Sequence, residues 1–272
     1  MFAKLNEFGK YNKNLIKSRV AEVSLKPNEI SRFFETAKKC HEACKSNKKI
    51  ITFLSIMSFL TTGAFCLIGA ANVNSLFFVL GGIVFLGFIV LRIIAAKLRK
   101  GIFNQEFIAA ASPFVENLAD DFKDESEIKL FVDFRGNTHK SKATGTQKIP
   151  RGKLTTYRDS WFSGYAYLAD KTLLQWEFNT LTKKKTITKR SRSGKTKTKT
   201  KHKSKYANSV TISRKTNSPL KAKNSVKGSV TTKIKVKEGK VAVKKIGQSD
   251  LPLSVDTMMK LTQSAFREFK KG

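Results

Sequence analysis

Lysines fill one stretch of the chain at a spacing that suits the binding of phosphate groups. Between positions 195 and 206 they alternate strictly with Thr, His, Ser and Tyr; the lysines are Lys195, Lys197, Lys199, Lys201, Lys203 and Lys205. In an extended strand, alternate side chains share a face and lie about 6.7 Å apart, which is twice the strand rise. Six ammonium groups in such a row predict electrostatic binding of a polyanion, either nucleic acid phosphates or anionic lipid headgroups.

The residues before this stretch predict a second basic strand that runs the other way. Lys185, Ile187 and Lys189 alternate, and Ser191-Arg192-Ser193-Gly194 is a turn candidate. We therefore expect a two-stranded basic arm over 183–206, with a disordered lysine-rich loop as the alternative because like charges repel. The polyanion-binding candidates are Lys183, Lys184, Lys185, Lys189, Arg190, Arg192, Lys195, Lys197, Lys199, Lys201, Lys203 and Lys205.

The distribution of charge supports a local anionic partner. The 272-residue chain has a formal net charge of +33, and residues 183–245 hold 23 Lys/Arg but one acidic residue, Glu238. Residues 101–182, with 10 Lys/Arg and 11 Asp/Glu, are nearly neutral. The excess of positive charge therefore points to a surface within the C-terminal half.

Two other motifs could carry chemistry. Cys40-His41-Glu42-Ala43-Cys44 places two thiols one helical turn apart, but a closed zinc site needs four ligands and no second pair follows. Asp120, Asp121, Asp124 and Glu125 could hold a divalent cation or exchange protons. Beside a basic region, a solvated face or internal salt bridges are the better interpretation, so no metal site is predicted.

The sequence shows no motif of a known catalytic class. It lacks the phosphate-binding GxxxxGK[ST] loop, the GxSxG elbow and the HExxH helix, and its three histidines are far apart. We predict no catalytic residue and no cofactor, and therefore a protein that is not an enzyme.

Two apolar runs must position this basic region. Residues 50–71 carry no formal charge, residues 76–96 carry only Arg92, and the polar segment 71–75 separates them. Each run is long enough to cross a bilayer as a helix, and a buried hairpin of a soluble protein is seldom apolar on every face. We expect an integral membrane protein with two transmembrane helices, 50–71 and 76–96.

The flanks of these runs predict orientation. Basic residues precede the first run and follow the second: Lys45, Lys48, Lys49, Lys97, Arg99 and Lys100. By the positive-inside rule, both termini are expected in the cytoplasm, at a plasma or inner membrane. Glycines within the runs would allow close helix packing within the hairpin or between two copies of the chain, so a homo-oligomer is an alternative.

The remaining segments predict an α+β cytoplasmic domain. Residues 1–49 are expected to form basic amphipathic helices, and 97–127 connector helices with Ser112 as an N-cap. Residues 128–272 alternate like a mainly antiparallel β-sheet: a strand at 128–134, a polar loop at 138–151, hairpins at 161–180 and 230–243, and a helix at 254–269.

Five aromatic residues are expected in the core of this sheet: Trp161, Phe162, Tyr165, Tyr167 and Trp176. An aromatic ligand pocket is the alternative. The whole pattern predicts a membrane-anchored, non-enzymatic protein whose basic β domain binds a polyanion. The alternative is a structural subunit of a membrane complex that docks an acidic partner protein.

Overall fold

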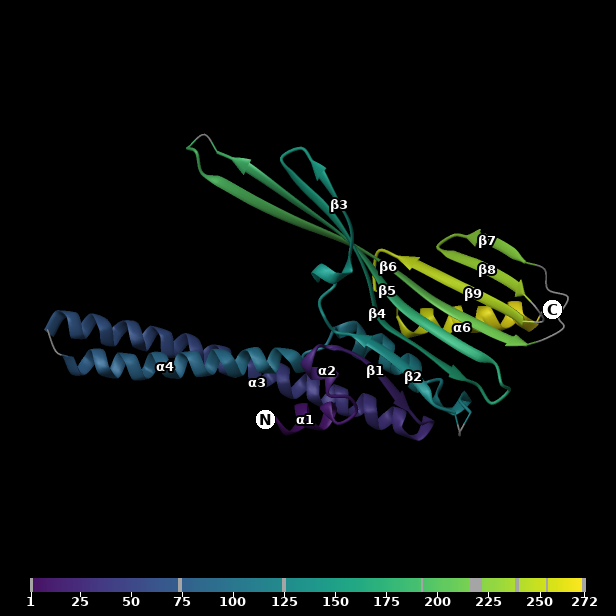
Figure 1. Cartoon of the computed structure of the whole chain (residues 1–272), viewed down its shortest axis with the longest axis horizontal. Helices are drawn as coiled ribbons and strands as arrows, with labels where there is room; N and C mark the ends of the chain where they lie inside the picture. The colour runs from purple at the N-terminus through teal and green to yellow at the C-terminus, as the bar shows by residue number, and fades with distance from the viewer. Residues whose placement is uncertain are drawn as a thin grey trace. The chain divides into compact units, whose positions relative to one another are not determined.

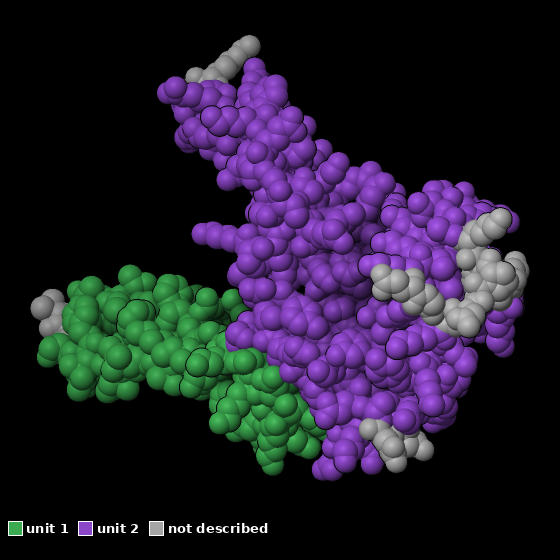
Figure 2. Space-filling view, turned by 45° about the vertical axis from the view of Figure 1, so that its right-hand side comes forward, with its two compact units in different colours: residues 1–17, 35–103 green, residues 18–34, 104–272 purple. Residues whose placement is uncertain are grey.

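The structure of the chain is a computed structural model that describes residues 2–72, 75–123, 126–191, 193–215, 222–237, 240–252 and 254–270. The chain divides into two compact units (Figure 2). The first comprises residues 1–17 and 35–103, and the second comprises residues 18–34 and 104–272.

The first unit is helical. It contains α1 (Ala3–Gly9), α2 (Asn14–Lys17), most of α3 (Ile30–Asn72), α4 (Ser75–Leu98) and the 3-10 turn η2 (Arg99–Gly101). The apolar parts of α3 and α4 lie side by side as a hairpin (Figure 1). The Ser58 hydroxyl of α3 donates a hydrogen bond to the Val84 carbonyl of α4 at 3.0 Å, and Phe59 packs on Phe88 at 5.6 Å.

Both helices of the hairpin expose their large apolar side chains. On α3 these include Ile50, Phe53, Leu54, Ile56, Met57, Phe59, Leu60, Leu67 and Ile68, and on α4 Leu76, Phe78, Val79, Ile83, Leu86, Ile89, Val90 and Ile93. Only 6% of the most apolar window of either helix is buried. The two long apolar helices predicted from sequence are thus confirmed, and both are long and apolar enough to cross a membrane. The turn predicted at 71–75 includes residues 73 and 74, which lie outside the described residues.

The second unit is built on a nine-stranded antiparallel sheet of described residues (Figure 1). The strands are β1 (Val20–Leu25), β2 (Ile128–Asp133), β3 (Ala143–Ile149), β4 (Gly152–Tyr167), β5 (Leu173–Arg190), β6 (Thr196–Lys215), β7 (Lys223–Lys227), β8 (Val230–Lys237) and β9 (Lys240–Ser249). Their order is β1-β2-β4-β5-β6-β9-β8-β7, and β3 pairs with the N-terminal part of β4. The large antiparallel sheet is therefore confirmed.

One face of this sheet is covered by the unit's own helices. These are the π-helical turn η3 (Phe107–Ala111), α5 (Ser112–Glu116) and the amphipathic α6 (Val255–Lys270), which packs on β6 and β9. Phe107 meets Phe162, and Phe114 meets Trp176 and Phe178 at 6.2 and 5.9 Å. The Ser254 hydroxyl accepts the Thr257 N–H at 3.3 Å and so caps α6, as its sequence predicted.

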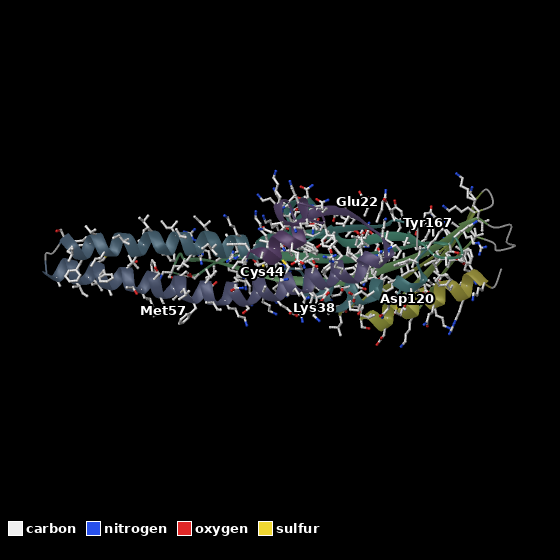
Figure 3. All side chains as sticks on the ribbon, turned by 90° about the horizontal axis from the view of Figure 1, so that it is seen from below. Glu22, Lys38, Cys44, Met57, Asp120 and Tyr167 are labelled. Carbon is white, nitrogen blue, oxygen red and sulfur yellow. The ribbon has the colours of Figure 1, made fainter. Side chains whose placement is uncertain are left out.

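Strand alternation explains why only one face is apolar. Val210 and Ile212 of β6 and Val241 and Val243 of β9 are buried on the covered face, while Ser209 and Thr211 point to the other face. We call this other side the open face. Figure 3 shows Glu22 and Tyr167 on the side of the sheet away from α6.

Three strands were not expected. β1 lies in the stretch 1–49 predicted to be helical, yet Ala21, Val23 and Leu25 alternate inward and pair with β2. β3 occupies the predicted polar loop 138–151, and β7 extends the hairpin of β8 and β9, whose turn residues 238 and 239 are not among those described. Each of these strands is short and polar or flanked by loops, so pairing with a neighbour decides its conformation.

The connector 97–127 also departs from the expected helices. The short elements η3, α5 and the 3-10 turn η4 (Ala119–Asp121) replace the longer helices expected on either side of Ser112-Pro113. Ser112 is the first residue of α5 and not its N-cap, which is Ala111, and Pro113 follows directly. The other short turns of the unit are η1 (Pro27–Glu29) and η5 (Lys140–Lys142).

Candidate polyanion-binding surface

β5 and β6 extend together beyond the helix-covered part of the sheet. Their pairing continues from Thr182 opposite Ser204 as far as Arg190 opposite Thr196. β3 and the first residues of β4 widen this extension, because Gly152 to Tyr157 pair with β5 on one side and with β3 on the other. The ordered arm, rather than a disordered loop, is what the structure contains (Figure 1).

The register gathers lysines from both strands on a single face. Cross-strand partners in an antiparallel pair point to the same side, and Lys183 lies opposite Lys203, Lys185 opposite Lys201, and Lys189 opposite Lys197. All of these lysines are exposed. We call the following set the lysine face: Lys183, Lys185, Lys189, Lys197, Lys199, Lys201, Lys203 and Lys205.

Carboxylates are scarce around the lysine face. The sequence has no Asp or Glu between Glu177 and Glu238. Among the described residues, one ion pair involves this face: Lys205 Nζ lies 3.8 Å from Asp250 Oδ1, and both side chains are exposed. Like charges placed directly opposite each other destabilise a strand pair, so this face gains most from external anions.

The reverse face of the extension carries mainly hydroxyl side chains of β5 and β6. Hydrogen bonds join hydroxyl groups of Thr182 and Ser204 at 3.0 Å, and of Thr188 and Thr198 at 3.4 Å. Its basic residues are Lys148, Lys153, Lys184 and Arg190. Short hydroxyl side chains therefore support the pairing of β5 with β6 on the reverse face, which carries fewer cationic side chains of these two strands than the lysine face does.

The structure sorts the sequence-predicted residues into groups. Eight of them form the lysine face, while Lys184 and Arg190 belong to the reverse face. Lys195 lies in the turn, where its carbonyl accepts the Ser191 N–H at 2.8 Å beside Gly194 with φ of 75°. Arg192 lies outside the described residues. Lys183, Lys185 and Lys189 alternate along β5 as the later lysines do along β6, which was the sequence signal for two rows of lysines. Only the register of the two strands shows that both rows lie on the same face.

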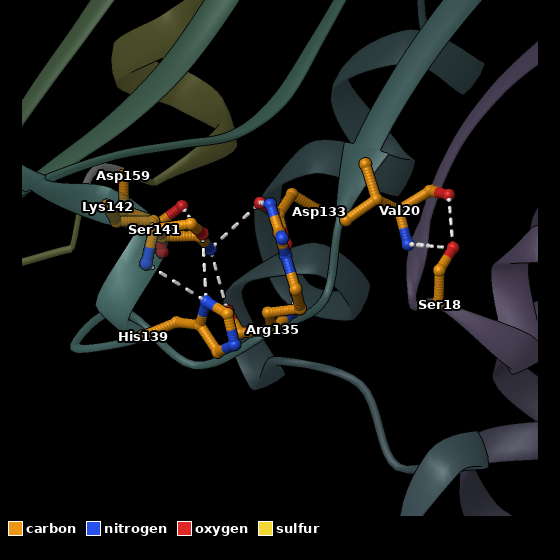
Figure 4. Close-up of polar contacts among 8 residues, drawn as sticks. All are labelled: Ser18, Val20, Asp133, Arg135, His139, Ser141, Lys142 and Asp159. Atoms are coloured by element: carbon orange, nitrogen blue, oxygen red, sulfur yellow. Dashed lines mark hydrogen bonds and ion pairs between the residues drawn. The ribbon is translucent and has the colours of Figure 1, made fainter.

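A buried ion-pair cluster lies at the base of the extension (Figure 4). Lys142 Nζ lies 2.6 Å from Asp159 Oδ1 and 3.3 Å from Asp133 Oδ2, and it donates to the Arg135 carbonyl at 2.7 Å. Arg135 binds Asp133 through its Nε and Nη2 at 3.0 and 2.8 Å. This cluster fixes the point where the chain enters β3.

The two carboxyl groups of the cluster respond oppositely to their surroundings. Burial raises the pKa of Asp159 in spite of the neighbouring Lys142. Burial acts in the same direction on Asp133, but the hydrogen bonds from Arg135, together with Lys142, hold its pKa below the usual value. Burial also raises the pKa of Glu106, whose carboxyl accepts a hydrogen bond from Tyr206 of β6.

The other chemical motifs show no such organisation. Cys40 and Cys44 are buried in the first unit, where a Cβ on Gly101 would lie within 3.2 Å of both sulfurs. His41 Nδ1 accepts the Phe103 N–H at 3.1 Å. Asp120 and Asp121 belong to η4, and Asp124 and Glu125 are outside the described residues. No group of three or more His, Cys, Asp or Glu suited to a metal occurs in the described part of the chain.

Comparison with known proteins adds no relative. No protein-family model matches the chain, and neither curated proteins nor solved structures give a significant match.

Proposed function

We propose that this chain is a two-pass membrane protein whose basic β unit binds a phosphate-rich polyanion through the lysine face. The observation that supports binding most directly is the set of three directly opposed lysine pairs, Lys183/Lys203, Lys185/Lys201 and Lys189/Lys197. A fold that keeps such pairs ordered, with so few carboxylates near them, suits an anion that neutralises several lysines at once. On this proposal the protein works by binding and not by catalysis.

The exposed apolar surface of α3 and α4 supports membrane insertion. A soluble monomer rarely exposes apolar patches beyond a few hundred Å², and here exposed apolar side chains run from residue 50 to residue 68 of α3 and from residue 76 to residue 93 of α4. Lysines and arginines flank the ends of the hairpin away from its turn, and by the positive-inside rule they support a topology with both termini on the cytoplasmic side. The sheet unit then lies on the side of the membrane that holds nucleic acid and anionic lipid headgroups.

The experiment compares two variants that remove equal charge from opposite faces. One replaces Lys197, Lys199, Lys201 and Lys203 with Gln; the control replaces Lys148, Lys153, Lys184 and Arg190 with Gln. Full-length protein in nanodiscs of neutral lipid is titrated with inorganic polyphosphate, with oligonucleotides and with vesicles containing phosphatidylserine, over a salt series.

The lysine-face variant is expected to lose affinity and to lower the salt slope for a single-stranded ligand by about 3, at roughly 0.7 for each phosphate contact. The control variant is expected to retain most of both. Equal losses in the two variants would show that net charge alone, without a binding face, governs the interaction. Absence of binding to every polyanion at low salt would overturn the proposal and leave an acidic partner protein.

A further inference from the structure

The open face carries a depression close to the lysine face. Two neighbouring rows of side chains run across the strands here. In the first, Lys129, Tyr165, Gln175, Thr211 and Lys244 lie opposite one another in succession. In the second, Phe131, Ser163, Glu177, Ser209 and Ile246 do the same. The second row therefore has large side chains at its ends, Phe131 and Ile246, and small serines on either side of Glu177.

This difference in side-chain size hollows the sheet surface. The residues around Ser163 and Ser209 leave a cavity of about 370 Å³ whose floor reaches Gly164 and Trp176. Gly164 lies beneath the depression, and a Cβ on it would point to the covered face, 2.6 Å from the Trp176 ring and 2.7 Å from the Lys129 carbonyl. The volume falls in the range of small-ligand sites.

Aromatic rings stand at the side of this depression. Tyr165 is half-buried and Phe131 is 38% exposed, although Tyr165 was expected in the core. Tyr167 is also on the open face, 45% exposed, but it lies outside this cavity. The expectation of five core aromatics therefore holds for Trp161, Phe162 and Trp176 and is wrong for the two tyrosines. Exposed rings on a sheet surface provide platforms on which nucleobases stack.

The polar groups of the depression suit a base better than a phosphate. Glu177 and Glu22 line it together with Lys129 and Lys244, so the lining is not purely cationic as the lysine face is, and the carboxylates can accept hydrogen bonds from the amino groups of bases. The Ser160 hydroxyl donates to Glu177 Oε1 at 2.9 Å and helps to fix the carboxylate. Gln175 adds both donor and acceptor groups.

The depression and the lysine face share the same side of the same two strands. On β6, Ser209 and Lys205 are four residues apart, and the register of β6 with β5 is the same at both, so their side chains point to the same side. They lie about 13 Å apart at 3.3 Å per residue. On β5, Glu177 and Lys183 are about 20 Å apart by the same measure. One flexible polyanion can therefore reach both regions.

We propose that the polyanion is a single-stranded nucleic acid, with a base stacked in the depression beside Tyr165 and Phe131 and its phosphates along the lysine face. This inference rests on the proposed function, since it names the partner class for the lysine face. A duplex keeps its bases stacked within the helix, and a bilayer surface presents no planar group that would enter the depression. Base stacking combined with a cationic track is the common design of single-strand binding surfaces.

The test uses full-length protein in nanodiscs of neutral lipid and three ligands of matched phosphate number: a single-stranded oligonucleotide, the same strand made abasic, and inorganic polyphosphate. Vesicles containing phosphatidylserine form a fourth arm. The variants are Tyr165→Ala, Phe131→Ala and Tyr165→Phe, with Tyr167→Ala as the matched control on the same strand. Circular dichroism and thermal unfolding check that each variant is folded.

The oligonucleotide is expected to bind more tightly than the abasic strand. Tyr165→Ala and Phe131→Ala each weaken oligonucleotide binding about tenfold and leave abasic and polyphosphate binding unchanged. Tyr165→Phe keeps the ring and restores affinity, and Tyr167→Ala has little effect.

Three results would contradict the inference. Equal binding of all the phosphate polymers, unaffected by Tyr165→Ala, overturns it but leaves the proposed function intact. Binding of the vesicles alone does the same and identifies lipid as the partner. Failure of every ligand to bind removes the proposed function as well.

Discussion

Lys142 Nζ lies 2.6 Å from Asp159 Oδ1, with both side chains almost entirely buried. Lys142 ends the turn η5 that leads into β3, and Asp159 belongs to β4, which carries the extension. Asp133, at the end of β2, shares the same ammonium group at 3.3 Å. One buried cation thus joins the helix-covered sheet to the extension that bears the lysine face.

Removal of this cation is expected to destabilise the second unit. Lys142→Ala leaves Asp159 buried beside Asp133 without its cation, which costs about 3 kcal/mol when one partner of a buried pair is lost. Urea unfolding of the full chain in detergent, followed by circular dichroism, measures the change. Lys140→Ala, an exposed lysine of the same turn, is the control and should stay within about 0.5 kcal/mol. Equal stability of Lys142→Ala and wild type would show that the cluster contributes nothing.

Glu106 should make stability depend on pH. Its folded-state pKa is raised by burial, so the folded chain holds this proton more tightly than the unfolded chain. The ionised carboxylate therefore lowers stability above the ordinary pKa of about 4.3, and wild type gains stability as the pH falls through the folded value.

Glu106→Gln removes this charge and retains an acceptor for Tyr206. We expect the variant to be at least as stable as wild type at pH 8, with the difference shrinking towards pH 4. Thermal unfolding over that range measures it, and Glu106→Ala, which loses the hydrogen bond, should be less stable than the Gln variant throughout. A Gln variant that is less stable than wild type by a constant amount would contradict the assignment.

Repulsion between the opposed lysines should destabilise the pairing of β5 with β6 in the extension. Lys201→Thr relieves repulsion with Lys185 and places a β-branched residue in the strand, so we expect a gain of a few tenths of a kcal/mol. Hydrogen exchange of the β5 and β6 amides reports it, and the gain should shrink at high salt. The same change at His202, which faces Lys184 on the reverse side, should give a smaller gain.

Local sequence pattern predicted the elements whose core is formed by near neighbours. The hairpin of β8 and β9 and the helix α6 keep apolar residues on a single side, and the two apolar helices need only their length. β1 could not be predicted in this way, since Val20–Leu25 becomes a strand by pairing with β2, more than a hundred residues later.

The candidate surface was predictable in composition and not in arrangement. The lysines of 183–205 are plain in the sequence, but their division between two faces depends on the register of β5 with β6. Tyr165 and Trp176 are both strand aromatics, yet Trp176 points to the helices and Tyr165 to the open face. The register of β4 with β5 shifts by one residue between positions 160 and 162 of β4, and this shift puts Tyr165 on the opposite face from Trp176. Sequence periodicity does not reveal such a shift.

Gly81 should allow α3 and α4 to pack closely. A Cβ there would lie 3.5 Å from Phe65 Cβ and 3.6 Å from Cys66 Sγ, so Ala fits but a larger side chain must separate the helices. Gly81→Leu is expected to lower stability in detergent by about 1–3 kcal/mol. Gly82→Leu is the control because nothing lies within 4 Å of its added Cβ. Equal thermal midpoints for the two variants would argue against the hairpin packing seen here.

Gly152 should be essential for the pairing of β4 with β5 in the extension. An added Cβ would overlap the Thr186 carbonyl oxygen and come within 3.0 Å of the Ile187 Cα, so Gly152→Ala must push β4 away from its neighbour. We expect amides near Lys153 and Thr186 to exchange faster, while pairs such as Thr188 with Thr198, formed by β5 and β6 alone, keep their protection. Gly145→Ala on β3, where nothing lies within 4 Å of the new Cβ, should leave exchange unchanged. Uniform loss of protection across β5 and β6 would instead mean that the lysine face depends on β4 for its order, and normal protection at Thr186 would show that the close approach is absent.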